Sequence, residues 1–411
     1  MYKTTTALAV VGALGLATTT RAEPITIDQA LERAARRPSV EITSLDVDAA
    51  RASARGAALP THNPELSAGA GPQLGAGAVS LQLQLGLSQT FELGGKRAAR
   101  IQLSEAQTRD AETVKRAGLL RARAEAWLAF ERALVLQDRL ATRLEVERLA
   151  TALAVAMQKT AQAGGVSKLR VNVVVAEAGR ATQERITTEA EYAGARATLA
   201  EAIGAGPRDQ LEPLGTVAEP PVPPANADEL VARALQDHPA IARTDNVQRI
   251  ARAKVADADA RGRVDITLGV AYAYAPDPDG AHAIVGTVSV PLPVGNRNQG
   301  ERAAARIAVA RADVERAHER ASIERAVRLA LENYQRARAA VAGFDLDVTG
   351  RLHENLAAAQ DAFAKGGIDF VELTTTQRDL IASRVAFLDA RLALVDAWAE
   401  LALAAAIEVN P

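Results

Sequence analysis

The chain has 411 residues and carries 48 basic and 50 acidic side chains, for a formal net charge of −2 at pH 7. This balance gives no indication of nucleic-acid binding. Cysteine is absent, which excludes disulfides, thiolate metal sites and an acylated N-terminal cysteine as a lipid anchor. Aromatic residues are only 3% of the chain, so the composition favours long helices that pack through small side chains over a large aromatic core.

Residues 1–22 are predicted to be a signal peptide for export. Lys3 precedes an apolar run over residues 7–17, and Ala22 ends a segment typical of a cleavage site. This run is too short to span a membrane. Removing the signal takes away Lys3 and Arg21 and leaves 46 basic against 50 acidic residues. No later stretch reaches the roughly 18 to 20 apolar residues of a membrane helix, so the exported chain is expected to be soluble or to cross a membrane as strands.

The first half of the mature chain, residues 23–204, is predicted to contain three helices and one β-hairpin. At about 1.5 Å per residue its longest helix would reach roughly 100 Å. The two shorter helices would then fit end to end beside it, in an elongated bundle or tube. In chain order we predict a helix, two strands, the long helix, a Gly-Gly turn and a return helix over residues 25–59, 65–72, 79–91, 96–161, 164–165 and 166–203.

The second half, residues 227–411, repeats this order, which predicts an internal duplication. Pro38 corresponds to Pro239, and Ser88 to Ser289, at an offset of 201 residues. The Gly-Gly turns correspond at an offset of 202. A proline-rich linker or small irregular segment, residues 205–226, joins the halves. The second set of elements is predicted over residues 227–260, 264–275, 283–291, 299–365, 366–367 and 368–407.

The second predicted strand alternates strictly between apolar and polar or small residues. A period of two is typical of a strand with one face toward an apolar phase and the other toward water. The third predicted strand also places its larger apolar residues on one face. The apolar phase that these faces contact is either lipid or a layer of helices, which is the usual partner of an alternating strand in a soluble protein. The residues predicted to face lipid are Leu81, Leu83, Leu85, Leu87, Leu268, Val270 and Tyr272.

A membrane location requires several copies of the chain. An open four-stranded sheet would leave unpaired backbone groups in hydrocarbon, and a closed membrane barrel needs at least 8 strands. The chain is therefore expected to share one barrel with other copies.

Basic residues begin both predicted long helices, where the helix dipole disfavours cations. Lys96, Arg97 and Arg100 occupy this position in the first half, and Arg297, Arg302 and Arg306 in the second. Anionic lipid headgroups are one explanation, and solvated surface charge is the other.

Three segments carry a resemblance to a known family: QTFELGGKR, GGVSKLRVNVVVAEAGRA and FAKGGIDFVELTTTQRDLIASRVAFLDARLAL. With the paired hairpins, they make the chain similar to the TolC family of outer-membrane efflux proteins over essentially its whole mature length. FELGGKRAAR most resembles the branch that serves heavy-metal efflux pumps of the resistance-nodulation-division type. The resemblance implies a mainly α fold with a small β part: a homotrimer with a shared 12-stranded transmembrane β-barrel and a long periplasmic helical barrel.

The same resemblance implies partners and site residues. The tube would end in a gated tip that docks a periplasmic adaptor, or membrane fusion protein, and an inner-membrane pump. The family often carries two acidic gate positions three residues apart, which here are Glu372 and Thr375, so one acid is kept and one is lost. Asp369 is the alternative acid of the gate. The residues expected at the adaptor-binding tips are Gly164, Gly165, Val166, Ser167, Gly366, Gly367 and Ile368.

No grouping typical of an enzyme is found. The five histidines, His62, His238, His282, His318 and His353, are scattered, with no pair at the spacing of helical metal ligands. No cofactor or catalytic residue is predicted. The expected function is a passive outer-membrane exit duct of a tripartite efflux system. The alternatives are a soluble periplasmic scaffold or adaptor-like protein and a periplasmic hydrolase, and the exported substrate stays open between a metal cation and another small molecule.

Overall fold

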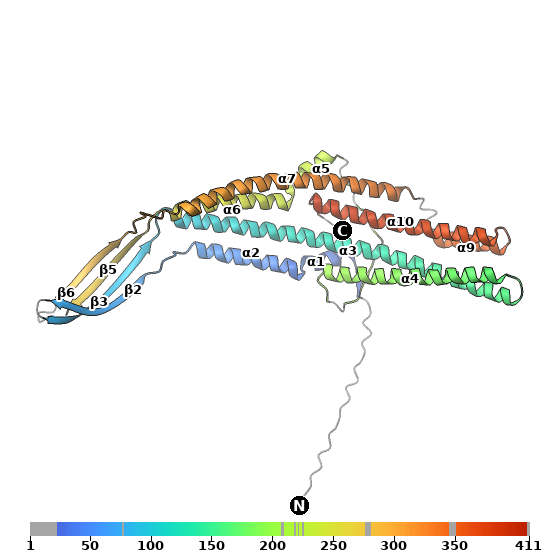
Figure 1. The fold of residues 1–411 in the computed structure, drawn as a ribbon, viewed down its shortest axis with the longest axis horizontal. Coiled ribbons are helices and arrows are strands. Elements are labelled where there is room, and N and C mark those ends of the chain that lie inside the picture. The colour runs from blue at the N-terminus through green and yellow to red at the C-terminus, as the bar shows by residue number, and fades with distance from the viewer. Residues whose placement is uncertain are drawn as a thin grey trace, which may run out of the picture.

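The structure is a computed structural model that describes residues 23–75, 78–206, 209–217, 219–220, 222–223, 226–275, 281–344 and 351–408. The predicted signal peptide lies outside these residues. The described chain is a long rod with a four-stranded sheet at one end and helices along the remaining length (Figure 1). The prediction of a mainly helical fold with a small β part is confirmed.

Most elements begin and end within a few residues of the predicted positions. The helices are α1 Ile27–Ala35, α2 Pro38–Ala57, α3 Lys96–Gln162, α4 Lys168–Ala202, α5 Ala227–Asp237, α6 Pro239–Arg261, α7 Gln299–Ala342, α9 Leu352–Ala364 and α10 Phe370–Ala404. The strands are β1 Glu23–Ile25, β2 Glu65–Gly75, β3 Ala78–Phe91, β4 Leu211–Pro213, β5 Ile266–Ala275 and β6 Ala281–Ser289.

Three predicted helices are each divided in two. Pro38 and Pro239 begin new helices, because proline fixes φ and lacks an N–H, which suits the first position of a helix and not its interior. The helix predicted over residues 299–365 is α7, which ends at Ala342 before Gly343, and then α9; residues 345–350 lie outside the described chain. The first strand of the sheet is longer than predicted and extends to Gly75.

The sheet is antiparallel in the order β2-β3-β5-β6, so its central pair joins the two halves of the chain. Leu85 lies opposite Tyr272, and Leu87 opposite Val270. The leucines of β3 and the larger apolar residues of β5 therefore share one face, here named the leucine face. Within this single chain the outer edges of β2 and β6 have no neighbouring strand among the described residues.

Each strand of the sheet is continuous with a helix, so the helices next to it follow the same lateral order, α2-α3-α6-α7. Toward the other end of the rod, α3 packs against α4 on one side and α10 on the other, and α9 packs against α10 (Figure 1). The long helix α3 thus packs against other helices both next to the sheet and toward the opposite end of the rod.

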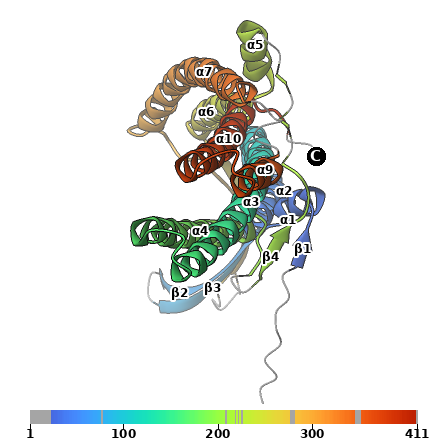
Figure 2. The same cartoon turned by 90° about the vertical axis from the view of Figure 1, so that its right-hand side faces the viewer.

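The main core lies near the middle of the rod, where the two halves meet. The rings of Trp127, on α3, and Trp398, on α10, are 4.5 Å apart between centroids. Buried aliphatic side chains of α1, α4, α5 and α7 complete this cluster. The short strands β1 and β4 pair in parallel beside it, so the predicted linker contains a strand. Seen end on, α5 and the β1–β4 pair lie at the periphery of the helical part (Figure 2).

Candidate functional site

The leucine face is exposed in the single chain. Leu83 and Leu85 are 45% and 53% exposed, and Tyr272 is 44% exposed. The sheet projects beyond the ends of the helices (Figure 1), so no described helix covers this face. An apolar surface of several strands left open to solvent is typical of a surface that contacts protein or membrane.

The opposite face of the sheet is polar and tightly packed through small residues. The hydroxyls of Thr90 and Thr267 lie 2.8 Å apart. A Cβ at Gly269 would lie only 2.6 Å from the hydroxyl oxygen of Thr287. A larger residue there would have to displace the Thr287 hydroxyl and would also lie close to the Ser88 Cβ, at 3.3 Å, so glycine is what lets the strands approach in this way.

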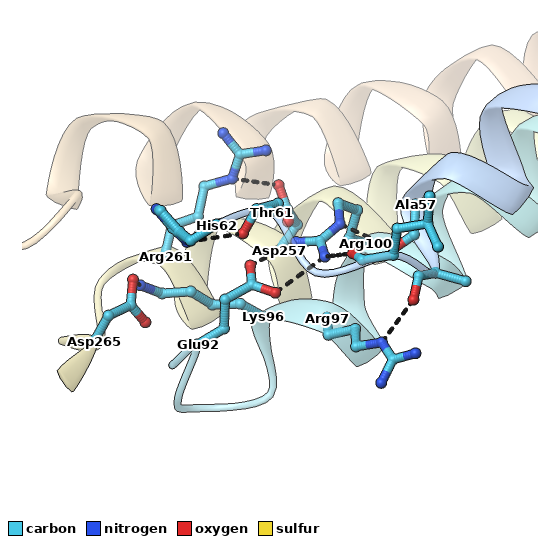
Figure 3. Close-up of polar contacts among 12 residues, drawn as sticks. Ala57, Thr61, His62, Glu92, Lys96, Arg97, Arg100, Asp257, Arg261 and Asp265 are labelled. Atoms are coloured by element: carbon cyan, nitrogen blue, oxygen red, sulfur yellow. Dashed lines mark hydrogen bonds and ion pairs between the residues drawn. The ribbon is translucent and has the colours of Figure 1, made fainter. Parts of the chain in front are cut away.

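The junction between sheet and helices is held by a network of ion pairs and hydrogen bonds (Figure 3). Arg100 donates two hydrogen bonds to the Glu92 carboxylate, at 2.7 and 3.1 Å. It also donates to the carbonyls of Ala57 and Leu59, each at 3.0 Å, and Arg97 donates to the Ala58 carbonyl at 2.8 Å. These carbonyls lie at the C-terminal end of α2, where carbonyls lack helical partners and the helix dipole favours cations.

A second contact joins the two strand-to-helix connections. Lys96 Nζ lies 2.6 Å from Asp265 Oδ2, and Asp265 Oδ1 accepts the Leu93 N–H at 3.0 Å. The side chains of Lys96 and Asp265 are only 15% and 20% exposed.

The basic residues at the start of α3 thus have protein partners, a role that neither predicted explanation contained. Neither solvated charge nor lipid headgroups are needed to account for Lys96 and Arg100. In the second half, Arg302 similarly pairs with Asp259, at 2.5 Å, and Arg297 Nε donates to the Pro293 carbonyl at 3.2 Å.

The Glu92 carboxylate is strongly acidic because of this network. The pKa of Glu92 is lowered to about 2, chiefly by the hydrogen bond from Arg100; burial opposes this shift, and the Thr61 hydroxyl adds to it. Glu92 therefore stays ionised and bound to Arg100 over the whole physiological pH range.

Both Gly-Gly turns lie at the end of the rod opposite the sheet (Figure 1). Gly164 and Gly366 have φ of +80° and +75°, a left-handed conformation that favours glycine. In each turn the second glycine donates to a carbonyl five residues earlier, Gly165 to Thr160 at 3.0 Å and Gly367 to Ala362 at 2.8 Å. This is the Schellman pattern of a helix end.

The residues after each turn start the return helices. Ser167 and Asp369 are the N-caps of α4 and α10, and their side chains accept the N–H groups of Arg170 and Glu372. Val166 and Ile368 lie between turn and cap and are half-buried.

Apolar side chains hold the two turn regions together, which sequence reasoning missed. Phe363 and Phe370 flank the second turn at 6.4 Å between ring centroids, in an edge-to-face arrangement. Both pack against a buried cluster that includes Met157 of α3 and Val174 of α4. The pair of phenylalanines in FAKGGIDF was the available signal.

Of the three predicted gate residues, Asp369 directly precedes α10, and Glu372 and Thr375 lie in its first two turns. The Asp369 carboxylate accepts the Glu372 N–H at 2.8 Å, so this acid has a structural role as a cap. Glu372 and Thr375 are exposed in the single chain, and the Thr375 hydroxyl donates to the Val371 carbonyl at 2.9 Å. Of the two acids, Glu372 is therefore the one whose side chain has no capping role.

A groove of about 510 Å³ lies between the return helices α4 and α10, and α3 also contributes to its lining. Val146, Ala181 and Ile381 contribute to its apolar lining. An ion pair between Glu177 and Arg378 crosses it, at 2.7 Å. Contacts of this kind depend on which helices lie side by side, and the sequence carries no direct signal for them.

Within the described chain no three histidine, aspartate or glutamate side chains form a group that could hold a metal ion. None of the helices described is both long and apolar enough to cross a membrane.

Comparisons with known proteins agree with this architecture. No family model matches the chain. The cobalt-zinc-cadmium resistance protein CzcC of Cupriavidus metallidurans is 25% identical over 299 residues, which are 72% of this chain and 71% of that protein. A solved structure of CusC, which is described as showing conformational changes during folding and transmembrane channel formation, is 18% identical to this chain. The match covers 92% of this chain and 91% of the CusC chain, with a TM-score of 0.72. The outer-membrane channel OprN is 18% identical, with coverages of 92% and 89% and a TM-score of 0.73. The resemblance to the TolC family is thereby confirmed: the chain has the fold of these outer-membrane channels and a sequence similar to that of CzcC.

Proposed function

We propose that this protein is the outer-membrane exit duct of a tripartite efflux system and conducts substrate passively from an inner-membrane pump to the exterior. The observation that carries the proposal is the exposed leucine face on a sheet with two open edges, at one end of a helical rod. A soluble scaffold would need to cover this face. Lipid and neighbouring copies of the chain cover it without further elements.

We propose a homotrimer in which three sheets close one 12-stranded barrel. Closure joins the free edge of β6 in one copy to the free edge of β2 in the next. The same closure would bring α7 of one copy beside α2 of the next, because the helices follow the lateral order of the strands.

The surfaces of α2 and α7 support this arrangement. Ile307 and Val314 on α7 are 69% and 70% exposed and lie seven residues apart, and Ile42 and Leu45 on α2 are also exposed. Exposed small and apolar residues continue both rows at alternating steps of three and four, the spacing of a coiled-coil seam. The rows are Ile42, Leu45, Ala49 and Ala52 on α2, and Ala303, Ile307, Ala310, Val314, Ala317 and Ala321 on α7.

The two halves are proposed to be copies of one ancestral unit, residues 23–204 and 227–411, with residues 205–226 as the connecting segment. Three such pairs would give the tube six-fold pseudosymmetry. The similar turns at Gly164 and Gly366 support this proposal.

The end with the Gly-Gly turns is proposed to bind the periplasmic adaptor and to form the gate. Six turns per trimer would ring the exit, and Glu372 would line the gate, because a carboxylate ring in a narrow pore attracts cations. The similarity to CzcC, a cobalt-zinc-cadmium resistance protein, supports a metal-cation pump of the resistance-nodulation-division type as partner. Specificity would lie in that pump, and the duct would perform no chemistry of its own.

The proposal is tested by producing the full chain in a Gram-negative host and locating it. We expect it in the outer-membrane fraction and as a trimer in mild detergent by light scattering. Reconstituted in planar bilayers, it should give discrete conductance steps. A monodisperse, detergent-free monomer in the periplasmic fraction would instead support the soluble scaffold.

A further inference from the structure

Arg37 and His238, 201 residues apart in the sequence, occupy corresponding places in the two halves. Each is the residue before a proline that begins the second of two consecutive short helices. Each therefore lies at a break between two consecutive helices.

Both side chains tie this break to the last turn of a return helix. Arg37 Nη1 donates to the Ala202 carbonyl at 3.3 Å. His238 Nε2 lies 3.2 Å from the Leu403 carbonyl, in the last turn of α10. Each set of contacts is here named a joint, the Arg37 joint and the His238 joint.

The Arg37 joint contains a permanent cation with its own counter-ion. Arg37 Nη2 lies 2.8 Å from the Glu125 carboxylate, and Arg37 Nε donates to the Ser39 hydroxyl at 2.7 Å. The residue 201 positions after Glu125 is Ala326. At the position of the second half that corresponds to Glu125, the chain therefore has an alanine instead of a carboxylate.

The His238 joint is made by a neutral imidazole. The Ala240 N–H donates to His238 Nδ1 at 3.1 Å and so caps α6. Because Nδ1 accepts that hydrogen bond, the proton of the ring is on Nε2, which donates to the Leu403 carbonyl. A second proton on Nδ1 would face the Ala240 N–H and abolish the cap. It would also place a cation at the N-terminal end of α6, where the helix dipole opposes it.

The surroundings of His238 also disfavour its cationic form. A cavity of about 250 Å³ adjoins the ring, with Arg121 of α3 and Arg243 of α6 in its lining. Glu319 on α7 is the acidic group that acts on the ring from the neighbouring helix, α10 presents the Leu403 carbonyl, and Asp237 precedes His238 at the end of α5. Burial lowers the pKa of His238, while the Leu403 carbonyl and Glu319 raise it.

We propose that the His238 joint is an acid-sensitive clasp, which opens when the medium around the protein becomes mildly acidic, whereas the Arg37 joint stays closed. Its contribution to stability is present above the ordinary histidine pKa of about 6.5 and is lost as the pH falls below it, because the unfolded or opened form binds the proton more tightly. When the clasp opens, the hydrogen bond from His238 to the Leu403 carbonyl is lost, so the segment between α5 and α6 is no longer held to the end of α10. The proposal does not rest on transport by the protein.

Hydrogen-exchange mass spectrometry of the full, assembled protein tests the clasp. Exchange is compared at about pH 7.5 and about pH 5.5, on either side of the ordinary histidine pKa, after scaling for intrinsic exchange rates. Residues 234–244 cover the His238 joint, and residues 33–43 cover the Arg37 joint as an internal control. We expect protection of 234–244 to fall roughly threefold or more at the acidic pH, and that of 33–43 to stay constant.

Substitutions separate protonation from other effects of acid. His238→Asn keeps a side-chain acceptor for the Ala240 N–H and cannot titrate, so its protection should not depend on pH. His238→Arg should lower the protection of residues 234–244 from exchange at both pH values. Adding Ala326→Glu to this variant should restore the protection, because the glutamate supplies a counter-ion. Equal protection of 234–244 at both pH values in the wild type would overturn the proposal. The same acid loss in His238→Asn would also overturn it, and if that variant does not assemble, the comparison of the two wild-type segments decides alone.

Discussion

Glu177 and Arg378, 201 residues apart in the sequence, form an ion pair that joins the return helices α4 and α10, with 2.7 Å between Arg378 Nη2 and Glu177 Oε1. The two return helices begin and end at an offset of 202 residues, so Glu177 and Arg378 lie within one residue of corresponding positions. The two halves therefore meet there through opposite charges. Because Arg378 is 63% exposed, water screens the pair and its contribution to stability is expected to be only about 0.2 to 1 kcal/mol.

Charge reversal tests this pair. Arg378→Glu should lower the thermal stability of the detergent-solubilised protein, because two carboxylates would then face each other. Adding Glu177→Arg should recover at least half of the loss, since the pair is rebuilt with exchanged signs. If the double variant is as unstable as the sum of both single variants, the two residues do not interact in the assembled protein.

A second prediction concerns the leucine face. Leu83→Arg should impair membrane assembly by about 2 to 4 kcal/mol if the residue lies near the bilayer midplane. Gln84→Arg, on the opposite face of the same strand, is the matched control and should be far milder. The fraction of trimer recovered from outer membranes measures both. Similar losses for the two variants would show that the leucine face does not contact lipid.

The contact between Glu92 and Arg100 at the junction of sheet and helices is expected to be lost at a lower pH than the hydrogen bonds of His238. The pKa of Glu92 is lowered to about 2, chiefly by the hydrogen bond from Arg100, so Glu92 stabilises the fold above its unfolded pKa of about 4.5. That stability, about 1 to 3 kcal/mol, is lost as the pH falls from about 5 toward 2. Glu92→Gln should remove this part of the pH dependence, as followed by thermal unfolding between those pH values. An unchanged acid profile would mean that the Glu92–Arg100 pair contributes little to stability.

The end of α10 offers a stabilising substitution. Ala406 has φ of +51°, a left-handed conformation, and Gly204, at the end of α4, has φ of +71°. Ala406→Gly should raise stability by about 1 kcal/mol, because glycine adopts this conformation without the steric cost that a Cβ brings. Ala405→Gly is the control and should lower stability, since Ala405 is buried. Differential scanning calorimetry distinguishes the two signs.

These residues also show which parts of the structure were readable from sequence. The alternation in β3 and the glycines of the two turns are local signals, because the period and the positive φ arise within a few residues of each other. The breaks at Pro38 and Pro239 were equally local and could have been predicted from proline chemistry. The contacts of Arg100 with the end of α2 could not, because they depend on which helix ends lie side by side. The cap formed by Asp369 is local, because its partner, the Glu372 N–H, lies only three residues later, so it could have been predicted from the preference for Asp before a helix.

The last prediction concerns the gate and separates Glu372 from Asp369. The cap geometry implies that Asp369 is held by the Glu372 N–H, whereas the Glu372 side chain is exposed at the end of the rod that carries the turns. In a closed three-fold tip the three Glu372 carboxylates would approach one another and favour a bound cation. In planar bilayers the channel should show cation preference and partial block by divalent cations added from the side of the turns. Glu372→Gln should reduce both without a large change in open conductance. Asp369→Asn removes a charge but keeps a good capping residue, so it should leave preference and block nearly unchanged. If Asp369→Asn abolishes block while Glu372→Gln does not, the acidic ring belongs to Asp369 and lies one helical turn closer to the tip.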